Sequence, residues 1–206
     1  CDTPAPVAST DPFAAGWTIN RSEVEILGGE EIGRGAFGRV VKAHWHGAVV
    51  ALKEIHDATP EALVDFQREF VALQQMRNHP RLVNLLGACF HNSEQTTTST
   101  GGGGSTGGNF ILMEFCGGGS FERHLGTNTD DSSHAHRWRV ERYSTILTCL
   151  ADVASGLQHM DHAGVVHRDV ACRNVLLVMS GEGMRAKLAD FGLAHVQRQV
   201  APVSPR

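Results

Sequence analysis

The 206-residue sequence contains no run of about 18 consecutive apolar residues, so no segment has the length and hydropathy of a membrane-spanning helix. It also lacks a basic stretch followed by an apolar stretch at its start, which is the pattern of a secretory signal. The chain does not begin with Met, and we therefore interpret it as a piece of a longer protein.

Paired cysteines and surplus positive charge are scarce as well. The 5 Cys are widely spaced without a Cys-x-x-Cys pair, which argues against a zinc site or a disulfide scaffold and favours a reducing, cytoplasmic location. Lys and Arg number 18 against 22 Asp and Glu, so the net charge of −4 does not indicate nucleic-acid binding. The apolar content of 41% and charged content of 19% are typical of a folded globular domain.

The N-terminal half has the pattern of a β-rich domain. Residues 1–21 are rich in Pro, Ala, Ser and Thr and show no period, so we interpret them as a flexible leader. The segments 24–33, 39–45 and 49–55 are rich in residues that favour strands, and a turn separates the last two. Together these segments predict an antiparallel meander.

A helix is predicted after the meander. Thr59, Pro60 and Glu61 form a typical helix start, with a capping hydroxyl, a Pro at the first position and an acid in the first turn. Apolar residues at 3-4-3 spacing then predict one buried face, and a His-Pro pair predicts the end of the helix. These residues are Leu63, Phe66, Phe70 and Leu73, followed by His79 and Pro80.

A run of Thr, Ser and Gly at 94–109 separates two predicted strands, 82–90 and 110–115. A linker between domains is one interpretation of this run, and a loop inserted into a hairpin is the other. Each doubling of loop length costs only about 0.6 kcal/mol of closure entropy, so the flanking strands can still pair. We favour a disordered loop inside one domain.

The C-terminal half is expected to be mainly helical. Polar residues at 126–137 predict a second loop, and apolar residues at 3.6-residue spacing predict a long amphipathic helix over 146–160. The segments 175–178 and 186–188 predict two short strands around a turn. The apolar face of the helix consists of Ile146, Leu147, Leu150, Val153, Ala154, Leu157 and Met160.

A glycine-rich run, GRGAFGRV, stands at residues 33–40. Gly33, Gly35 and Gly38 fit the pattern G-x-G-x-x-G, in which the backbone can approach a polyphosphate and offer it N–H groups. A dinucleotide-binding turn uses the same glycines but needs a helix directly after them. Here the residues that follow are β-rich, which disfavours that alternative.

Four further motifs follow the glycines. They are VALK, which ends at Lys53 on the third predicted strand, Glu69 on the predicted helix, HRDVACRN at 167–174 and DFG at 190–192. Taken singly, a strand lysine often faces solvent and a helix glutamate is usually solvated. All of the motifs in this order, with these intervening elements, are not expected by chance.

The set of motifs resembles the catalytic domain of eukaryotic protein kinases, and the resemblance covers residues 24–200. It implies a bilobal α+β fold, with a β-rich N-lobe carrying one helix at 22–116 and an incomplete helical C-lobe at 117–206. The N-lobe is most similar to the tyrosine-kinase-like group. The catalytic loop, with Ala171 and Arg173, is more similar to tyrosine kinases, so the resemblance leaves Tyr and Ser/Thr substrates both open.

The resemblance implies an enzyme that uses ATP and Mg²⁺ to phosphorylate a hydroxyl group of a protein substrate. Lys53, paired with Glu69, would contact the α- and β-phosphates. Asp169 would accept or orient the proton of the attacking hydroxyl, with Arg173 beside it in the catalytic loop. The implied ligands of Mg²⁺, a cation that prefers oxygen, are Asn174 and Asp190.

The resemblance also implies a nucleotide pocket. Val40, Ala51 and Leu176 would enclose the adenine, Met113 would lie behind it, and Glu114 and Cys116 would offer backbone hydrogen bonds. The whole implied nucleotide set is Ile32, Gly33, Gly35, Gly38, Val40, Ala51, Lys53, Met113, Glu114, Cys116 and Leu176. Leu73, Leu85, His167 and Phe191 would stack as an apolar spine between the lobes.

The sequence departs from the family after Gly192, because the Ala-Pro-Glu triplet and the C-lobe helices of the family are absent. We therefore expect the isolated chain to be inactive and to aggregate through the uncovered face of its long helix. The alternative function is that of a pseudokinase or truncated nucleotide-binding regulatory protein. The enzyme is favoured by the joint presence of Lys53, Glu69, Asp169, Asn174 and Asp190.

Overall fold

The computed structural model describes residues 16–35, 38–55, 59–76, 78–90, 109–126, 135–181 and 183–196. Within these ranges it describes all side chains except those of 29, 30, 35, 126 and 135–142. The predicted loop at 94–109 lies outside the described residues apart from Asn109, as do the last ten residues of the chain. None of the helices within the described ranges combines the length and hydropathy needed to span a membrane.

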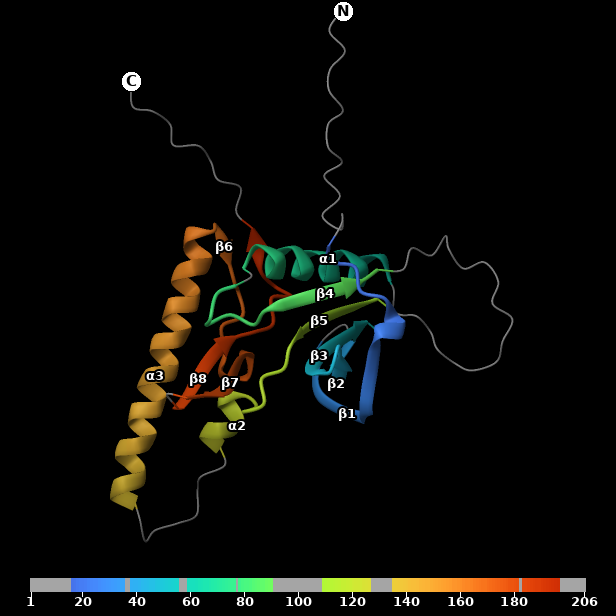
Figure 1. Cartoon of the computed structure of the whole chain (residues 1–206). Helices are drawn as coiled ribbons and strands as arrows, with labels where there is room; N and C mark the ends of the chain where they lie inside the picture. The colour runs from blue at the N-terminus through green and yellow to red at the C-terminus, as the bar shows by residue number, and fades with distance from the viewer. Residues whose placement is uncertain are drawn as a thin grey trace, which may run out of the picture.

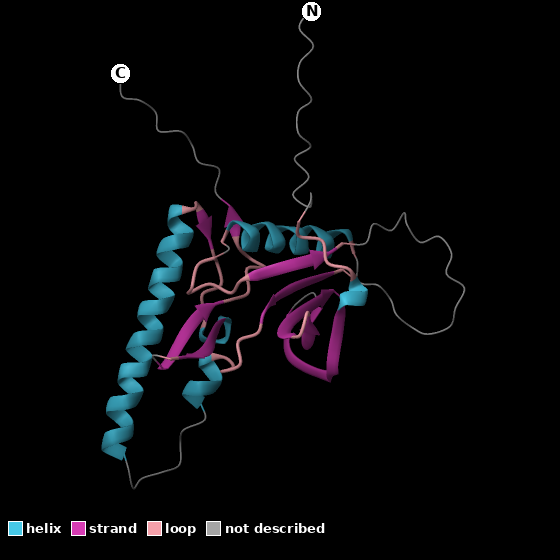
Figure 2. Cartoon of the chain, viewed as in Figure 1, coloured by secondary structure: helices cyan, strands magenta, loops and turns pink. Residues whose placement is uncertain are grey.

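A five-stranded antiparallel sheet forms the N-terminal half (Figures 1 and 2). A 3₁₀ turn, Arg21–Glu23, leads into its first strand, and the strand order is β1-β2-β3-β5-β4. The meander predicted from the sequence is confirmed, since β1 pairs with β2 and β2 with β3 in antiparallel register. The strands are β1 (Val24–Gly35), β2 (Gly38–Trp45), β3 (Ala48–Ile55), β4 (Leu85–Cys89) and β5 (Phe110–Glu114).

The fourth strand is shorter than predicted from the apolar run at 82–90. Leu82 and Val83 lie outside the sheet and contact the second half of the chain instead. Val83 donates its N–H to Leu188 O at 2.9 Å. A run of apolar residues does not by itself distinguish one long strand from two short segments buried against different partners.

Helix α1 (Pro60–Gln75) lies along β4 (Figure 1). Its predicted start is confirmed, because Thr59 caps it by accepting a hydrogen bond from Ala62 N at 3.2 Å. Phe66, Phe70 and Leu73 are buried on the face turned toward the sheet. The helix ends at Gln75, four residues before His79, the first residue of the predicted His-Pro stop.

The described part of the predicted leader packs against the sheet. Ile19 donates its N–H to Ala88 O at 2.9 Å, Ala88 donates to Trp17 O at 2.8 Å, and Ile19 is buried. The Trp17 ring meets the Phe70 ring edge to face, with centroids 6.5 Å apart. The prediction of a flexible leader up to residue 21 is therefore wrong for residues 17–19, because they pair with Ala88 of the edge strand β4.

The second half contains two short sheets and two helices. The predicted pair of strands is confirmed as the hairpin β7–β8, and β6 pairs with β9. Helix α3 begins at Ala135, so the prediction of a loop over 126–137 is wrong for its last residues; the apolar period that marks a helix starts only at Ile146. The elements are α2 (Phe121–Gly126), α3 (Ala135–His162), β6 (Val165–Val166), a 3₁₀ turn (Cys172–Asn174), β7 (Val175–Ser180), β8 (Gly183–Leu188) and β9 (His195–Val196).

The buried face of α3 differs from the predicted apolar face. Its fully buried positions include Cys149, Asp152 and Met160, at helical spacing. Leu147 and Leu150, both expected on the covered face, are 65% and 53% exposed. Periodicity identifies an apolar side of a helix but not the side that a neighbouring element covers.

Candidate functional site

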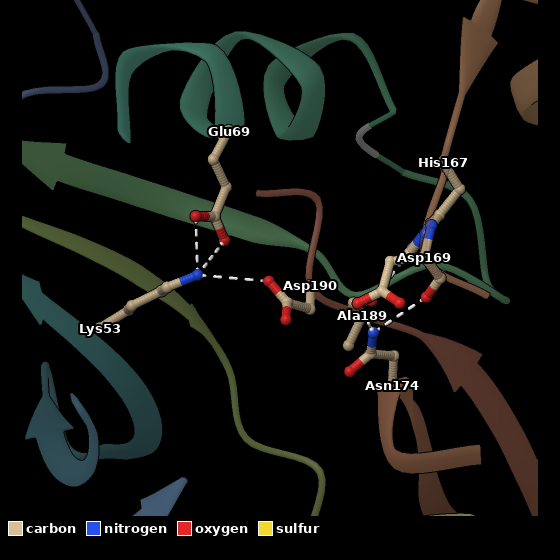
Figure 3. A network of polar contacts seen from close by, with 7 residues as sticks. All are labelled: Lys53, Glu69, His167, Asp169, Asn174, Ala189 and Asp190. Carbon is tan, nitrogen blue, oxygen red and sulfur yellow. Dashed lines mark hydrogen bonds and ion pairs between the residues drawn. The ribbon is translucent and has the colours of Figure 1, made fainter. Parts of the chain in front are cut away.

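The strand lysine and the helix glutamate meet between the sheet and α1 (Figure 3). Lys53 Nζ lies 2.6 Å from Glu69 Oε1 and 2.7 Å from Glu69 Oε2. Asp190 approaches the same ammonium group from the second half of the chain, with 3.4 Å between Nζ and Oδ1. Three residues that are far apart in sequence are therefore brought to one point by β3, α1 and the end of β8.

The Lys53 side chain is only 14% exposed, and its charge is set by its neighbours. Burial alone lowers the pKa of Lys53, but the charges of Glu69 and Asp190 outweigh it, so that the pKa is raised. Burial raises the pKa of Glu69, and the ammonium group of Lys53 opposes that shift. Two short contacts to one carboxylate and the raised lysine pKa support an ion pair with Lys53 protonated.

Asp169 is held at both carboxylate oxygens. Arg173 donates to Asp169 Oδ1 at 2.6 Å, and Asn174 Nδ2 donates to Oδ2 at 2.8 Å and to the backbone oxygen at 2.9 Å. The hydrogen bonds from Arg173 and Asn174 lower the pKa of Asp169, so this carboxylate is ionised at neutral pH. Its side chain is 26% exposed, so a hydroxyl group can reach it from solvent.

His167 fixes the loop that carries Asp169. Its Nδ1 accepts the Asp169 N–H at 3.3 Å, so the ring proton lies on Nε2, which donates to Ala189 O at 3.1 Å. Burial lowers the pKa of His167, which keeps the ring neutral in this arrangement. The bond to Ala189 links the loop directly to the residue before Asp190.

Two residues of the site have a left-handed backbone. Arg168 has φ of 68° and Asp190 has φ of 62°, in a region that non-glycine residues seldom adopt. Backbone strain of this kind persists only where the surrounding contacts hold it, and it is common at functional sites. Arg168 directly precedes Asp169, and Asp190 itself carries the other carboxylate on which the candidate chemistry depends.

The predicted apolar spine forms a continuous packed group. Leu73, Leu85 and Phe191 are buried in the same core cluster, and the His167 ring lies 5.2 Å from the Phe191 ring, centroid to centroid. This cluster contains residues from α1, β4 and the second half of the chain, so it joins the two halves behind the site.

A cavity of about 290 Å³ lies beneath the glycine run. Gly38 lines it, and a Cβ at that position would collide with the backbone oxygen of Glu54, so a side chain cannot be added without moving β3. The chemistry-bearing residues that line it are Lys53, Glu69, Asp169, Arg173 and Asp190. The structure thus places around one cavity the residues that were predicted to act on the phosphates and on the acceptor hydroxyl.

The predicted adenine-side residues do not line this cavity. Met113, Cys116 and Leu176 do pack together in one small cluster, and Ala51 lies opposite Met113 in the sheet. Val40 lies opposite both Gly33 and Lys53, whereas Ile32 is exposed. Burial raises the pKa of the Cys116 thiol to about 12, so it is not a reactive thiolate.

Glu114 has a side-chain role that the sequence did not indicate. Its Oε1 accepts from Lys187 Nζ at 2.6 Å and from Asn84 N at 2.7 Å, and its own N–H donates to Asn84 O at 3.0 Å. The backbone N–H of Glu114 is therefore used within the protein, and Lys187 was not a predicted site residue. The only sequence signal was a lysine between apolar residues in β8.

Asp190 and Asn174 fit the oxygen preference of Mg²⁺. Asp190 lines the cavity with a half-exposed carboxylate, and Asn174 is hydrogen-bonded to Asp169, which lines the same cavity. Within the described ranges, no cluster of three or more His, Cys, Asp or Glu side chains can hold a metal ion alone. A site of two protein ligands suits Mg²⁺ that is also bound by phosphate oxygens.

Comparison with known families identifies the class of protein. The model of the protein tyrosine and serine/threonine kinase family matches residues 26–202. The chain therefore belongs to this kinase family, as its motif set and its α+β architecture indicated. The match includes all of the residues around the cavity.

Relatives of both substrate classes are similar to the chain. The dual specificity protein kinase splA of Dictyostelium discoideum is 32% identical, over 92% of this chain and 8% of that protein. The megakaryocyte-associated tyrosine-protein kinase of Mus musculus is also 32% identical, over 90% and 30% respectively. The serine/threonine-protein kinase VIK of Arabidopsis thaliana is 28% identical, over 93% and 39%. The chain spans well under half the length of these relatives.

Proposed function

We propose that the protein containing this chain transfers the γ-phosphoryl group of ATP to a hydroxyl group of a protein substrate. The observation that carries the proposal is that one cavity is lined by the Lys53–Glu69 pair and by the carboxylates of Asp190 and Asp169. Asn174 is hydrogen-bonded to Asp169. This arrangement has a fixed positive charge for phosphate, oxygen ligands for a metal and an ionised carboxylate for the acceptor.

Each residue then has a distinct task. Lys53, held by Glu69, binds the phosphates of the nucleotide, and the backbone of the glycine run covers them. Magnesium, when bound, neutralises the charge that develops on the phosphate oxygens. Asp190 and Asn174 would hold the ion. Met113, Cys116 and Leu176, which pack in one cluster, would contact the adenine.

Asp169 orients the attacking hydroxyl. Its lowered pKa keeps it ionised, so it accepts a hydrogen bond from the acceptor hydroxyl and points that oxygen at the γ-phosphate. The guanidinium of Arg173, 2.6 Å from Asp169 Oδ1, holds this carboxylate in place. Phosphoryl transfer depends mainly on such positioning and on electrostatic stabilisation.

The test is Asp169→Asn in the full-length protein. We expect phosphoryl transfer to fall by at least about 10³-fold, since an acceptor-orienting carboxylate is lost, while ATP binding stays near the wild-type value. Asp161→Asn, which removes an exposed carboxylate of α3, is the matched control. Unchanged turnover in Asp169→Asn would remove Asp169 from this role, and ATP binding without transfer by the wild type would favour the pseudokinase alternative.

Substrate and location are parts of the same proposal. We place the domain in the cytoplasm, a compartment that suits the free thiols of Cys116, Cys149 and Cys172. Arg173 and Ala171 favour Tyr as the acceptor, while the N-lobe resemblance favours the tyrosine-kinase-like group, in which Ser and Thr are common acceptors. Phosphoamino-acid analysis of the reaction products distinguishes the two.

A further inference from the structure

A second polar cluster lies outside the cavity, around Asp152 on α3. The Asp152 side chain is 3% exposed, and its two oxygens are shared by two arginines. Arg185 donates from Nε to Oδ2 at 2.9 Å and from Nη2 to Oδ1 at 2.6 Å, and Arg81 Nε lies 2.8 Å from Oδ1. The backbone N–H of Ala186 donates to Oδ2 at 2.9 Å.

These contacts keep Asp152 ionised although it is buried. Burial alone raises the pKa of Asp152, but the hydrogen bonds from Arg185 and Ala186 and the charge of Arg81 outweigh it, and the pKa is lowered. A buried carboxylate with this many donors holds its partners in defined positions, because moving any of them leaves a buried charge without compensation.

The partners of Asp152 lead to the candidate site. Arg185 and Ala186 belong to β8, which ends two residues before Asp190. The backbone of Arg81 also meets this strand, because Leu188 donates to Arg81 O at 2.9 Å. Ala189 then donates to Asn174 O at 2.8 Å, which connects the end of β8 to the second predicted metal ligand.

Arg81 belongs to the segment 78–84, which follows α1 and precedes β4. Gly156, one helical turn after Asp152, allows α3 to approach this segment closely. A Cβ at Gly156 would lie 2.9 Å from Leu82 Cδ2 and 3.1 Å from Arg81 O. In Figure 1, α3 runs beside β8 at the same place. Three elements therefore meet at Asp152, and one of them continues directly from the helix that carries Glu69.

We propose that Asp152 is a positioning residue for phosphoryl transfer. By holding Arg185 and Arg81 together, it fixes β8 against the segment 78–84, and so fixes Asp190 relative to the Lys53–Glu69 pair. This inference rests on the proposed function but concerns a residue that touches neither nucleotide nor acceptor. It acts on the metal-binding and phosphate-binding groups only through the backbone of β8 and the end of α1.

The experiment compares Asp152→Asn with Asp161→Asn in the full-length protein. The two variants each remove one carboxylate from α3, but Asp161 is exposed. We measure the Mg²⁺ concentration for half-maximal ATP binding, together with kcat and KM for ATP. Residues that orient metal ligands affect metal affinity or activity by about 10-fold to 100-fold. We expect an increase of that size in the Mg²⁺ requirement of Asp152→Asn, and wild-type values for Asp161→Asn.

A milder variant keeps the test valid if Asp152→Asn does not fold. Arg81→Met retains the aliphatic part of the side chain and leaves the Asp152–Arg185 pair intact. We expect it to shift the Mg²⁺ requirement in the same direction by a smaller factor. A Mg²⁺ requirement equal to that of the wild type in both folded variants would overturn the proposal, since a purely structural role lowers only the folded fraction.

Failure of the positioning role and failure of the proposed function give different results. If the wild type binds Mg²⁺ and ATP but transfers no phosphate, the proposed function fails, while the Mg²⁺ requirement for binding still decides the role of Asp152. If the wild type is an active kinase and Asp152→Asn has wild-type kcat and Mg²⁺ requirement, the kinase function stands and the positioning role is wrong.

Discussion

Helices α1 and α3 are both amphipathic, but their surroundings differ. The apolar face of α1 is covered by the sheet and by the residues around Trp17, and Phe70 on that face is completely buried. Helix α3 packs one side against β8 and the segment 78–84, whereas Leu147 and Leu150 on another side are 65% and 53% exposed. The contribution of an apolar helix residue to the free energy of unfolding therefore depends on whether another element covers it.

The difference in packing between the two helices affects the candidate site, because α1 carries Glu69. The ion pair with Lys53 is held in place by a helix that is packed along its inner face. By contrast, α3 contributes to the site only through its inner face, where Asp152 holds Arg185 and Arg81. The outer face of α3 has no described contact with the site.

The largest expected effect is on α1. We expect Phe70→Ala to lower the free energy of unfolding by about 3–5 kcal/mol, because a fully buried aromatic ring is removed and a cavity remains. The loss also removes the edge-to-face contact with Trp17. Urea denaturation of the full-length protein, monitored by far-UV circular dichroism, measures the change.

The control for this prediction is Leu150→Ala on α3. In the 206-residue chain we expect it to change the free energy of unfolding by no more than about 0.5 kcal/mol, since more than half of this side chain is already in contact with solvent. A cost similar to that of Phe70→Ala in the same chain would mean that the outer face of α3 is packed, and the contrast between the two helices would not hold.

Much of the fold and of the site could be predicted from the sequence, because the signals are either local, such as a helix start, or belong to motifs that follow one another in a known order. The start of α1 was marked by Thr59 and Pro60, and the convergence of Lys53, Asp169 and Asp190 was implied by a known family. The cluster of Asp152, Arg81 and Arg185 was not predicted, because its members are distant in sequence and belong to no motif. The same reason explains the packing of Ile19 against Ala88, which pairs two segments far apart in the chain.

An intermediate effect is expected where α3 meets the segment 78–84. The His79 and His159 rings stack there, with centroids 4.5 Å apart and planes at 14°. Burial and the charges of His159, Arg81 and Lys187 lower the pKa of His79. These three are the charged groups that face it from α3, from its own segment and from β8.

The sign of the pH effect follows from that shift. An imidazole whose pKa is lower in the folded protein stabilises the fold above its ordinary pKa of about 6.5, and this contribution is lost as the pH falls. We expect the melting temperature to fall between about pH 7.5 and pH 5.5, and the fall to be smaller in His159→Phe, which keeps a stacked ring without a titrating group. His162→Phe, on an exposed position of the same helix, is the control. Equal acid sensitivity in all three proteins would remove the stacked pair from this role.

The smallest effect on stability is expected on the outer face of α3. We expect Leu147→Gln combined with Leu150→Gln to change the free energy of unfolding of the 206-residue chain by no more than about 1 kcal/mol, because both side chains are mostly exposed in it. In the isolated 206-residue chain the same pair of changes should reduce aggregation, since adjacent exposed leucines favour self-association. Light scattering at increasing protein concentration measures this. If the isolated wild-type chain instead unfolds in one sharp, reversible transition without aggregating, then its stability does not depend on covering this face, and the expectation drawn from the leucines is wrong.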